Sequence, residues 1–428
     1  MSGVRVHNPA LLELGLTLPG FIERGKVIAS MPSLGLLTLA AHTPPEWHVE
    51  YAEYDETPPA IDHDLVAISS LPARIEDAYV LADRLRSEGK TVVIGGLHAS
   101  VLPEEALNHA DAVVVGEGEG LWKQLLGDWP TLKPIYRSPP SREFDWQVPR
   151  FDLLDIDRYN RIPVQTARGC PLDCSFCAAS RLISPYKRKT MQWIRAELEA
   201  VLERWPKPFI ELADDNTFVH KAWSKDLVRL LGEYPIRWFT ETDISVADDD
   251  ELLELLAQSG CAQLLIGLES TDPESLRETD GKSWKLRRRD RYCEAIAKIQ
   301  NHGISVNGCF IHGFDHDDAS VFASTAAFVR DSGLSEVQVT ILTPFPGTAL
   351  YRNLQREGRL LKERFWDRCT LFDVTYRPAR MSVHELEEGF RWLIGELYSA
   401  EETERRRSLM RGNYRRMRRH EVGVESPA

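Results

Sequence analysis

The chain has 428 residues, 43% of them hydrophobic, with seven cysteines and a formal net charge of −13. Its length is sufficient for two or three domains with sizeable cores, and the negative charge argues against nucleic acid as the main partner. An odd, sparse set of cysteines is not typical of a disulfide-stapled secreted domain, and no run approaches the ~18 apolar residues of a transmembrane segment. Residues 1–25 lack the basic start and apolar core of a signal peptide, so we expect a cytoplasmic protein.

The first third of the chain alternates short strand-like runs with helical patterns. The runs span residues 4–9, 48–56, 64–70, 91–96 and 111–120. This alternation predicts an α/β, doubly wound (Rossmann-like) domain over residues 1–135, in which ligands bind at the carboxyl ends of the strands. The loops after the last three runs are therefore candidates for a nucleotide-like cofactor, with these residues: Ser69, Ser70, Gly95, Gly96, His98, Gly116, Glu117 and Glu119.

The rest of the chain divides at a proline-rich stretch. Residues 130–160 hold five prolines and no sustained hydrophobic period, and we place a linker at 136–160. Between 161 and 350, six strand-like runs alternate with helical patterns that end in glycine, which is the αβ connection of parallel sheets. Residues 351–428 have mostly helical patterns, with a capping box at Ser382–Glu385 and eight arginines between Arg405 and Arg419.

Three of the seven cysteines fall close together, as Cys170, Cys174 and Cys177, directly after the first of these six strand-like runs. Structural zinc sites usually take four ligands in two separated pairs, and the remaining cysteines are scattered singly. Three thiolates with one vacant position suit an iron–sulfur cluster whose fourth iron binds another ligand. A structural metal site or a chance cluster is the alternative.

The Cys170-x₃-Cys174-x-Phe176-Cys177 stretch resembles the radical S-adenosylmethionine (SAM) superfamily. The resemblance implies a partial (β/α)6 barrel over residues 161–350 and a [4Fe–4S] cluster whose open iron binds SAM. It also implies SAM contacts at the strand ends, and these are Phe176, Asp214, Asp215, Asn216, Glu241, Glu269, Ser270, Lys282, Gly308, Ile311, Gly313 and Pro344. Family members often have Gly-Gly-Glu where this chain has residues 214–216, and a solvated acidic turn is the alternative there.

A doubly wound domain containing "VVIGGLHASVLPEEAL" and "DAVVVGEGE", followed by a linker and this core, resembles the cobalamin-binding radical SAM subfamily. The match extends over nearly the whole chain to residue ~400, and the subfamily includes C-methylases and the anaerobic cyclase of bacteriochlorophyll synthesis. The resemblance implies cobalamin (B12) at the loops of residues 1–135, with His98 beside the corrin. The Asp-x-His-x-x-Gly motif that gives other B12 proteins an axial histidine is absent, and a degenerate domain retained for packing is the alternative.

The resemblance implies an oxygen-sensitive enzyme that methylates an unactivated carbon of a small-molecule, lipid-like or natural-product substrate through a 5′-deoxyadenosyl radical and methylcobalamin. No residue is predicted as a general base, since the radical removes the hydrogen. Cyclisation, oxidation or rearrangement with the same cofactors is one alternative, and a non-enzymatic cobalamin or SAM sensor is another.

The end of the chain supplies two further hypotheses. The arginine-rich tail is either a solvated end or a surface that attracts an anionic substrate, a lipid surface or an electron donor such as flavodoxin or ferredoxin. Trp366, Phe372 and Tyr376 line either an apolar substrate site or the core.

Overall fold

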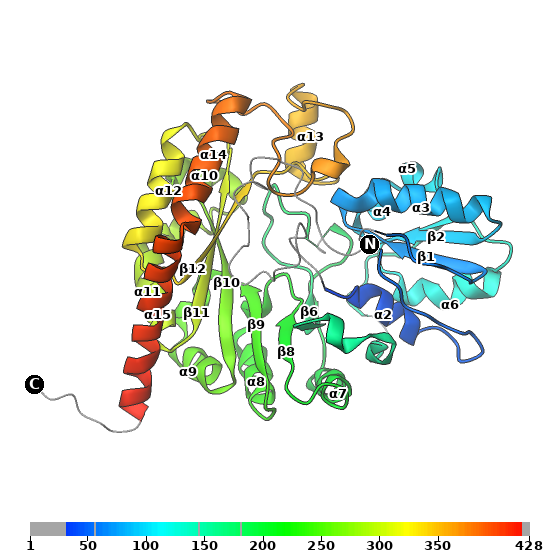
Figure 1. Cartoon of the computed structure of the whole chain (residues 1–428), viewed down its shortest axis with the longest axis horizontal. Coiled ribbons are helices and arrows are strands. Elements are labelled where there is room, and N and C mark those ends of the chain that lie inside the picture. Colours follow the sequence, from blue (N-terminus) through cyan, green and yellow to red (C-terminus); the bar gives the residue numbers. More distant parts are fainter. Residues whose placement is uncertain (1–30, 55–56, 144–145, 180–181, 422–428) are drawn as a thin grey trace, which may run out of the picture.

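A computed structural model describes residues 31–54, 57–143, 146–179 and 182–421, with the side chains of 416–421 left out. The described residues form two parallel sheets, each covered by helices, which lie beside one another (Figure 1). A third, small sheet is the antiparallel pair of β6 (Ala167–Arg168) and β7 (Lys187–Arg188).

The first sheet has four parallel strands in sequence order. They are β1 (Leu65–Ser69), β2 (Thr91–Gly95), β3 (Ala112–Val115) and β4 (Ile135–Arg137). Helices cover both faces, with α3, α4 and α5 on one side and α2 and α6 on the other (Figure 1). They are α2 (Leu34–Ala41), α3 (Ile75–Ser87), α4 (Leu97–Val101), α5 (Pro103–Leu107) and α6 (Glu119–Asp128). This arrangement confirms the predicted doubly wound α/β architecture.

Two local predictions for this sheet differ from the structure. Residues 48–54, which we predicted as a strand, are extended but pair with no described strand. Their polar groups bond to side chains and loops instead, as where the Tyr51 hydroxyl accepts a hydrogen bond from Ser33 N at 2.7 Å and donates to Glu53 at 3.0 Å. Conversely, β4 continues the sheet to Arg137, inside the segment that we predicted as linker. The run at 4–9 lies outside the described residues.

The second sheet has six strands in the order β12-β11-β10-β9-β8-β5, all parallel to their neighbours, as predicted for a partial (β/α)6 barrel. They are β5 (Ile162–Val164), β8 (Phe209–Leu212), β9 (Arg237–Thr242), β10 (Cys261–Glu269), β11 (Ser305–His312) and β12 (Glu336–Ile341). The helices between them are α7 (Met191–Leu202), α8 (Lys221–Leu231), α9 (Asp250–Gln258), α10 (Pro273–Thr279), α11 (Tyr292–Asn301) and α12 (Ser320–Asp331). Gly260, Gly303 and Gly333 follow three of these helices with positive φ, which explains the repeated helix–Gly–strand pattern.

The two faces of the second sheet differ in chemistry. Trp238, Ile266 and Val306 are fully buried in the main hydrophobic core with residues of the covering helices. Because side chains alternate along a strand, the neighbouring positions, such as Glu241 and Cys309, lie on the opposite, inner face. The inner face therefore carries the polar groups from which a site can be built.

Three further helices complete the chain, and they are α13 (Ala349–Arg356), α14 (Val383–Tyr398) and α15 (Ala400–Glu421). The predicted capping box at the start of α14 is confirmed, because Ser382 and Glu385 each accept the other's backbone N–H. The α14 residues Leu386, Phe390 and Leu393 enter the main core. Within the described part of the chain, no helix combines the length and apolar character that a membrane crossing needs.

Candidate functional site

The three clustered cysteines lie in one loop, directly after β6. The loop begins at Gly169, whose φ is +78°, and a Cβ there would lie 2.9 Å from Tyr186 N, so only glycine fits. Burial raises the pKa of the Cys174 thiol to about 12, and the charges of Lys285, Cys177 and Cys170 all act on it, which shows that the cysteines form one group. A bound metal ion would reverse this shift, because cysteine binds metals as the thiolate.

The carboxylate of Asp214 holds this loop in place. Its carboxylate is 3% exposed and accepts hydrogen bonds from Thr166 N at 2.7 Å, Ala167 N at 2.9 Å and Thr217 Oγ1 at 3.1 Å. Burial raises its pKa to about 6, and these hydrogen bonds oppose the rise. We predicted that Asp214 grips SAM; the structure gives its oxygens to the backbone that precedes the cysteines.

The next two residues lie closer to the cysteines. Asp215 accepts a hydrogen bond from Gly169 N at 2.8 Å, one residue before Cys170. Asn216 is buried and donates to Asp243 Oδ2 at 3.0 Å. Burial raises the pKa of the Cys170 thiol, and a hydrogen bond with the Asn216 side chain opposes that rise. The structure thus brings the predicted residues 215 and 216 to the cysteine loop, and their contact with SAM stays a prediction.

A buried ion pair flanks the cysteine loop on the other side. Lys285 Nζ lies 2.7 Å from Glu269 Oε1 and donates to Gly267 O at 2.7 Å, and both side chains are at most 10% exposed. Glu269 has a φ of +65°, which is uncommon for a residue with a side chain and typical of functional sites. Lys282, which we predicted as a SAM contact, is exposed, and the sequence analysis missed the buried Lys285 three residues later.

Glu241 occupies the inner face of the second sheet. Glu241 is exposed on this face of the sheet. Desolvation by the surrounding protein, together with the negative charges of Glu211 and Asp215, raises the pKa of Glu241 to about 8. Glu211 is itself paired with Arg161 at 2.7 Å. The carboxyl groups on this face suit a cationic ligand such as the sulfonium and ammonium groups of SAM.

The other predicted SAM contacts divide between the two faces. A Cβ on Gly308 would lie 2.8 Å from Leu334 Cδ1, so Gly308 faces the covering helices and not the hollow, which corrects our prediction. Gly313 has a φ of +103° and its carbonyl accepts a hydrogen bond from the buried Tyr376. Four further SAM contacts stay predictions, and they are those of Phe176, Ser270, Ile311 and Pro344.

The predicted loops of the first sheet surround a cavity of about 180 Å³ at the carboxyl ends of β1, β2 and β3. Its lining includes Ser69, Gly95, Gly96, Gly116, Glu117 and Glu119. Gly96 and Gly116 have φ values of +99° and +88°, and a Cβ on Gly116 would lie 3.3 Å from Ser138 O. The loops therefore form a cradle of backbone and small side chains that a large, flat cofactor or its tail can approach closely.

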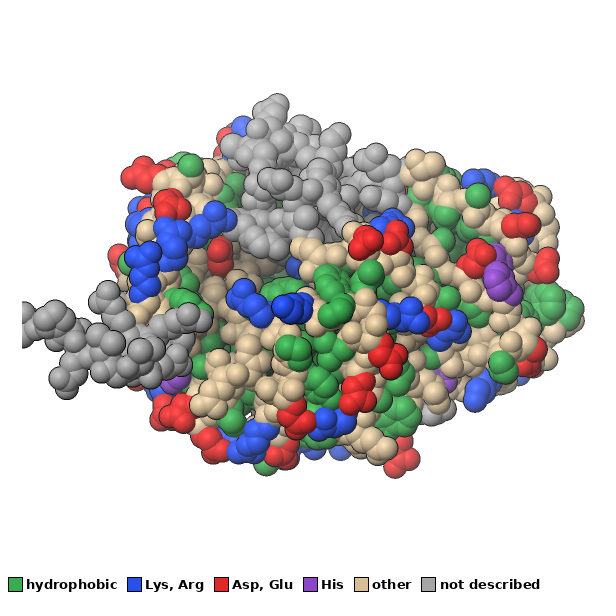
Figure 2. All heavy atoms as spheres, turned by 60° about the horizontal axis from the view of Figure 1, so that its bottom comes forward, with side chains coloured by type: hydrophobic (Ala, Val, Ile, Leu, Met, Phe, Trp, Pro, Cys, Tyr) green, Lys and Arg blue, Asp and Glu red, His purple; other side chains and the backbone are tan. Residues whose placement is uncertain are grey.

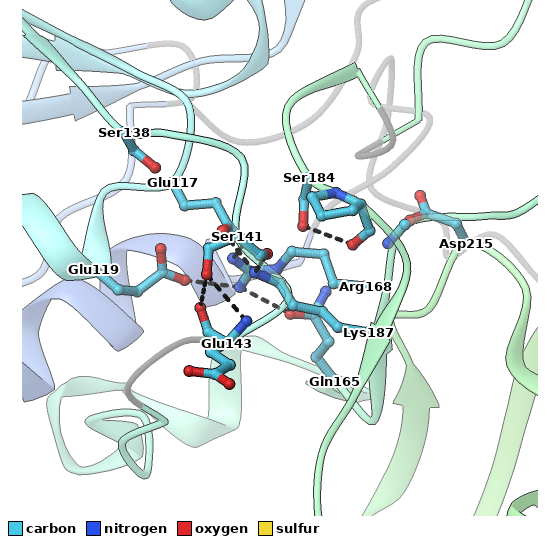
Figure 3. Close-up of polar contacts among 12 residues, drawn as sticks. Glu117, Glu119, Ser138, Ser141, Glu143, Gln165, Arg168, Ser184, Lys187 and Asp215 are labelled. Atoms are coloured by element: carbon cyan, nitrogen blue, oxygen red, sulfur yellow. Dashed lines mark hydrogen bonds and ion pairs between the residues drawn. The ribbon is translucent and has the colours of Figure 1, made fainter.

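Glu117 and Glu119 connect this cradle to the cysteine loop (Figure 3). Arg168 lies between them, with Nη1 at 2.9 Å from Glu117 Oε1 and Nη2 at 2.8 Å from Glu119 Oε1. Lys187 pairs with the second oxygen of Glu117 at 2.6 Å, and Lys187 and Arg168 face one another across the β6–β7 pair. Because Arg168 stands two residues before Cys170, a buried ionic network ties the two regions together. The sequence did not reveal this pairing.

His98 and Ser70 lie away from the cavity. His98 is 1% exposed, its Nε2 lies 3.2 Å from Glu105 Oε1, and its ring packs edge-on against Trp366 at 5.4 Å. Ser70 is buried and donates to Leu71 O at 3.1 Å. We predicted that His98 contacts the corrin. In the structure His98, in α4, contacts Trp366 of the C-terminal region instead. Trp366 is likewise buried, in the core and not in a substrate site.

Comparison with known proteins supports the same two sites. Family models described as "Radical SAM superfamily", "B12 binding domain" and "Domain of unknown function (DUF4070)" match residues 164–329, 24–126 and 348–425. Bacteriochlorophyllide d C-8(2)-methyltransferase of Chlorobaculum tepidum is 30% identical over 81% of this chain and 81% of its own length. The C-12(1)-methyltransferase of the same organism is 28% identical over 78% of this chain and 75% of its own length.

The chain belongs to the family of cobalamin-dependent radical SAM methyltransferases. A solved structure of the same fold is the radical SAM methyltransferase TsrM of Kitasatospora setae with cobalamin and a [4Fe–4S] cluster bound, with a TM-score of 0.62 and 14% identity over 86% of this chain and 90% of that chain. The enzyme combines a radical SAM domain, for SAM and a [4Fe–4S] cluster, with a B12-binding domain. Its own residues fit these groups, since three cysteines share one loop and a glycine cradle lies at the first sheet.

Proposed function

We propose that this enzyme transfers a methyl group to an unactivated carbon of a small-molecule or lipid-like substrate. The observation that carries the proposal is the junction of the two sites, since Arg168 lines the glycine cradle and stands two residues before Cys170. When bound, the cluster with SAM supplies hydrogen abstraction by a radical, and cobalamin supplies the methyl group. The names of the two methyltransferases from C. tepidum support methylation at carbon as the outcome.

Within this proposal, Cys170, Cys174 and Cys177 hold the cluster at the carboxyl end of the second sheet. Asp214 fixes the backbone before them, through Thr166 and Ala167. This division separates the residues that bind iron from the buried carboxylate that orients their loop. We assign the domains as residues 1–135, 136–160, 161–350 and 351–428, for the cobalamin domain, the linker, the radical SAM core and the C-terminal region, with the last strand of the first sheet, β4, extending two residues into the linker.

Charged side chains around the cysteines would orient SAM. Lys285 has three N–H donors and gives two of them to described residues, Glu269 and Gly267. Its third donor is available to the SAM carboxylate, so we transfer to Lys285 the role that the sequence assigned to Lys282. Asn216 and Asp215 offer acceptors for the SAM ammonium group, and Glu241 is close enough for the charge of Asp215 to act on it.

The reaction needs an external electron for the cluster, and we propose an electron-transfer protein such as flavodoxin or ferredoxin as the donor. A cytoplasmic location would provide the reducing environment that the cysteines and the cluster require. None of the proposed steps needs a general base from the protein, because hydrogen abstraction by a radical leaves the chain to bind and orient.

The test begins with anaerobic purification and reconstitution with iron, sulfide and hydroxocobalamin. We expect about four irons and one cobalt per chain, with the ultraviolet–visible bands of both groups. Extracts of the native host incubated with SAM that carries a deuterated methyl group should then yield a product heavier by one labelled methyl group. A product of unchanged carbon count would instead show cyclisation, oxidation or rearrangement. Absence of iron after reconstitution would contradict the proposal as a whole.

A further inference from the structure

A second large cavity lies at the opposite, amino-terminal end of the six-stranded sheet. It has a volume of about 830 Å³ and lies between the beginnings of β9 to β12 and the helix α15. In Figure 2, Lys and Arg side chains gather on the left of this face, beside the C-terminal end of the chain. From Cys261, which lines the cavity, to Glu269, beside the cysteine loop, β10 rises over eight residue steps, or roughly 26 Å. The cavity is therefore remote from the proposed reaction.

Arginines from two distant parts of the chain converge on this cavity. Arg237 comes from the first position of β9, and Arg407, Arg411 and Arg415 form one stripe of α15 at intervals of four residues. Arg411 pairs with Glu404. The other three guanidinium groups are exposed and form no hydrogen bond or ion pair with any residue that the structure describes. Most of the other arginines whose side chains the structure describes do have such partners.

The negative charge near the cavity does not offset these arginines. Glu336 is the one carboxylate among the described lining residues. Burial raises the pKa of Glu336, and the positive charges of Arg406 and Arg407 oppose that rise. One carboxylate therefore faces several guanidinium groups. Arg406 lies behind it, 1% exposed, with Nη1 bonded to Leu397 O at 2.7 Å and no described partner for Nε or Nη2. A chain of net charge −13 thus concentrates positive charge at one hollow.

We propose that this cavity binds a phosphate-bearing molecule through Arg237, Arg407 and Arg415. The planar guanidinium group matches two phosphate oxygens at once, and like charges four residues apart on a helix are unfavourable until an anion neutralises them. The volume suits a phosphorylated organic molecule and greatly exceeds a single phosphate ion. Such a ligand would hold α15 against the sheet and act as a regulator or anchor of the enzyme, beyond the proposed methyl transfer.

The experiment measures binding by the full-length reconstituted enzyme, with pyrophosphate as the probe in isothermal titration. The variant is Arg407→Ser with Arg415→Ser, and the matched control is Arg84→Ser with Arg356→Ser, which removes the same charge from exposed positions elsewhere. We expect saturable binding by the wild type and the control. The double variant should bind pyrophosphate at least about tenfold more weakly, because it loses the charge-assisted hydrogen bonds of two arginines.

A parallel sedimentation assay uses vesicles of phosphatidylglycerol and of phosphatidylcholine. Pyrophosphate binding without vesicle binding identifies a free phosphorylated ligand, and phosphatidylglycerol binding that the variant loses identifies a lipid headgroup as the source of the phosphate. Equal binding by the variant and the control would overturn the proposal, as would the absence of binding in both assays. Because neither assay uses SAM or substrate, these outcomes are independent of whether the enzyme methylates carbon.

Discussion

The two cofactor sites of this enzyme are built from different kinds of residue. The cradle on the first sheet consists mainly of small residues and backbone, with Gly96 and Gly116 at positive φ. The site on the second sheet consists of thiols and charged side chains, among them the buried pair Glu269–Lys285 at 2.7 Å. A large ligand that brings its own metal needs space and close backbone approach, whereas a cluster and a small charged ligand need donors. Substitutions that add atoms should therefore damage the first site, and substitutions that remove thiols or charges should damage the second.

The largest expected effect comes from Cys174→Ala, in the middle of the cysteine loop. Without one of three thiolates the cluster should be lost, so we expect iron per chain and SAM cleavage to fall to background while cobalt binding remains. Iron analysis, visible spectra and chromatographic assay of SAM cleavage measure these results. Cys293→Ala, at an exposed position of α11, is the control and should keep its iron. An iron-replete Cys174→Ala protein would show that the cysteine loop does not hold a cluster.

Lys285→Met tests the charged site more narrowly. It leaves the buried Glu269 without its ion-pair partner, and we expect the free energy of unfolding to fall by about 3–5 kcal/mol. Denaturant unfolding of the apoprotein measures this change, and equilibrium dialysis of the reconstituted protein should show weaker SAM binding. The exposed Lys282→Met is the matched control, with an expected change below about 0.5 kcal/mol. Similar losses in both variants would contradict the position we assign to Lys285.

Arg168→Met tests the connection between the sites. Glu119 would lose its ion-pair partner, but Glu117 would keep Lys187 at 2.6 Å, so we expect a loss of about 3 kcal/mol, at the low end for a broken buried pair. Since Arg168 touches both regions, iron and cobalt retention should both decrease, whereas Lys285→Met should weaken SAM binding and leave cobalt retention unchanged. Metal analysis of the two variants side by side decides this. Normal retention of cobalt by Arg168→Met would show that the network does not shape the cradle.

The smallest expected effect is that of Gly116→Ala in the cradle. At a φ of +88°, alanine should cost about 1–2 kcal/mol, and its Cβ would press on Ser138 O at 3.3 Å. We expect reduced cobalamin retention with iron unchanged, which spectra and metal analysis measure. Gly120→Ala, in α6 with no atom within 4 Å of its Cβ, should instead stabilise the fold by about 0.5–1 kcal/mol. Unchanged cobalamin retention by Gly116→Ala would place the cofactor elsewhere.

Local sequence patterns predicted much of this enzyme. The αβ architecture follows from helical patterns that end in glycine before an apolar run, and the positive φ of Gly260 and Gly303 supplies the reason. The order of the two sheets follows the order of these runs. The prediction of a strand at 48–54 was wrong. Alternation of polar and apolar residues indicates a half-buried extended segment, but it does not indicate whether another strand pairs with that segment.

Two predicted contacts failed because of direction and not of location. Lys282 and Lys285 stand on the same short segment, and only the folded loop decides which ammonium group turns towards Glu269. Gly308 lies on the predicted strand, but a difference of one residue along a strand moves a side chain to the other face, and a Cβ on Gly308 would face Leu334. The sequence alone does not give the register of the strand, so it does not say towards which face a side chain points.

The sequence by itself determined the cysteine loop, the glycine-rich strand ends and the order of the cofactor domains, because each is a pattern of residues close together in the chain. The tertiary structure alone decided which charges meet, as in the pairing of Glu117 with Arg168, 51 positions apart, and in the approach of Arg237 to Arg407. Such encounters depend on the packing of whole elements against one another. Propensity and spacing act over a few residues, whereas ion pairing and cavities are set by the fold.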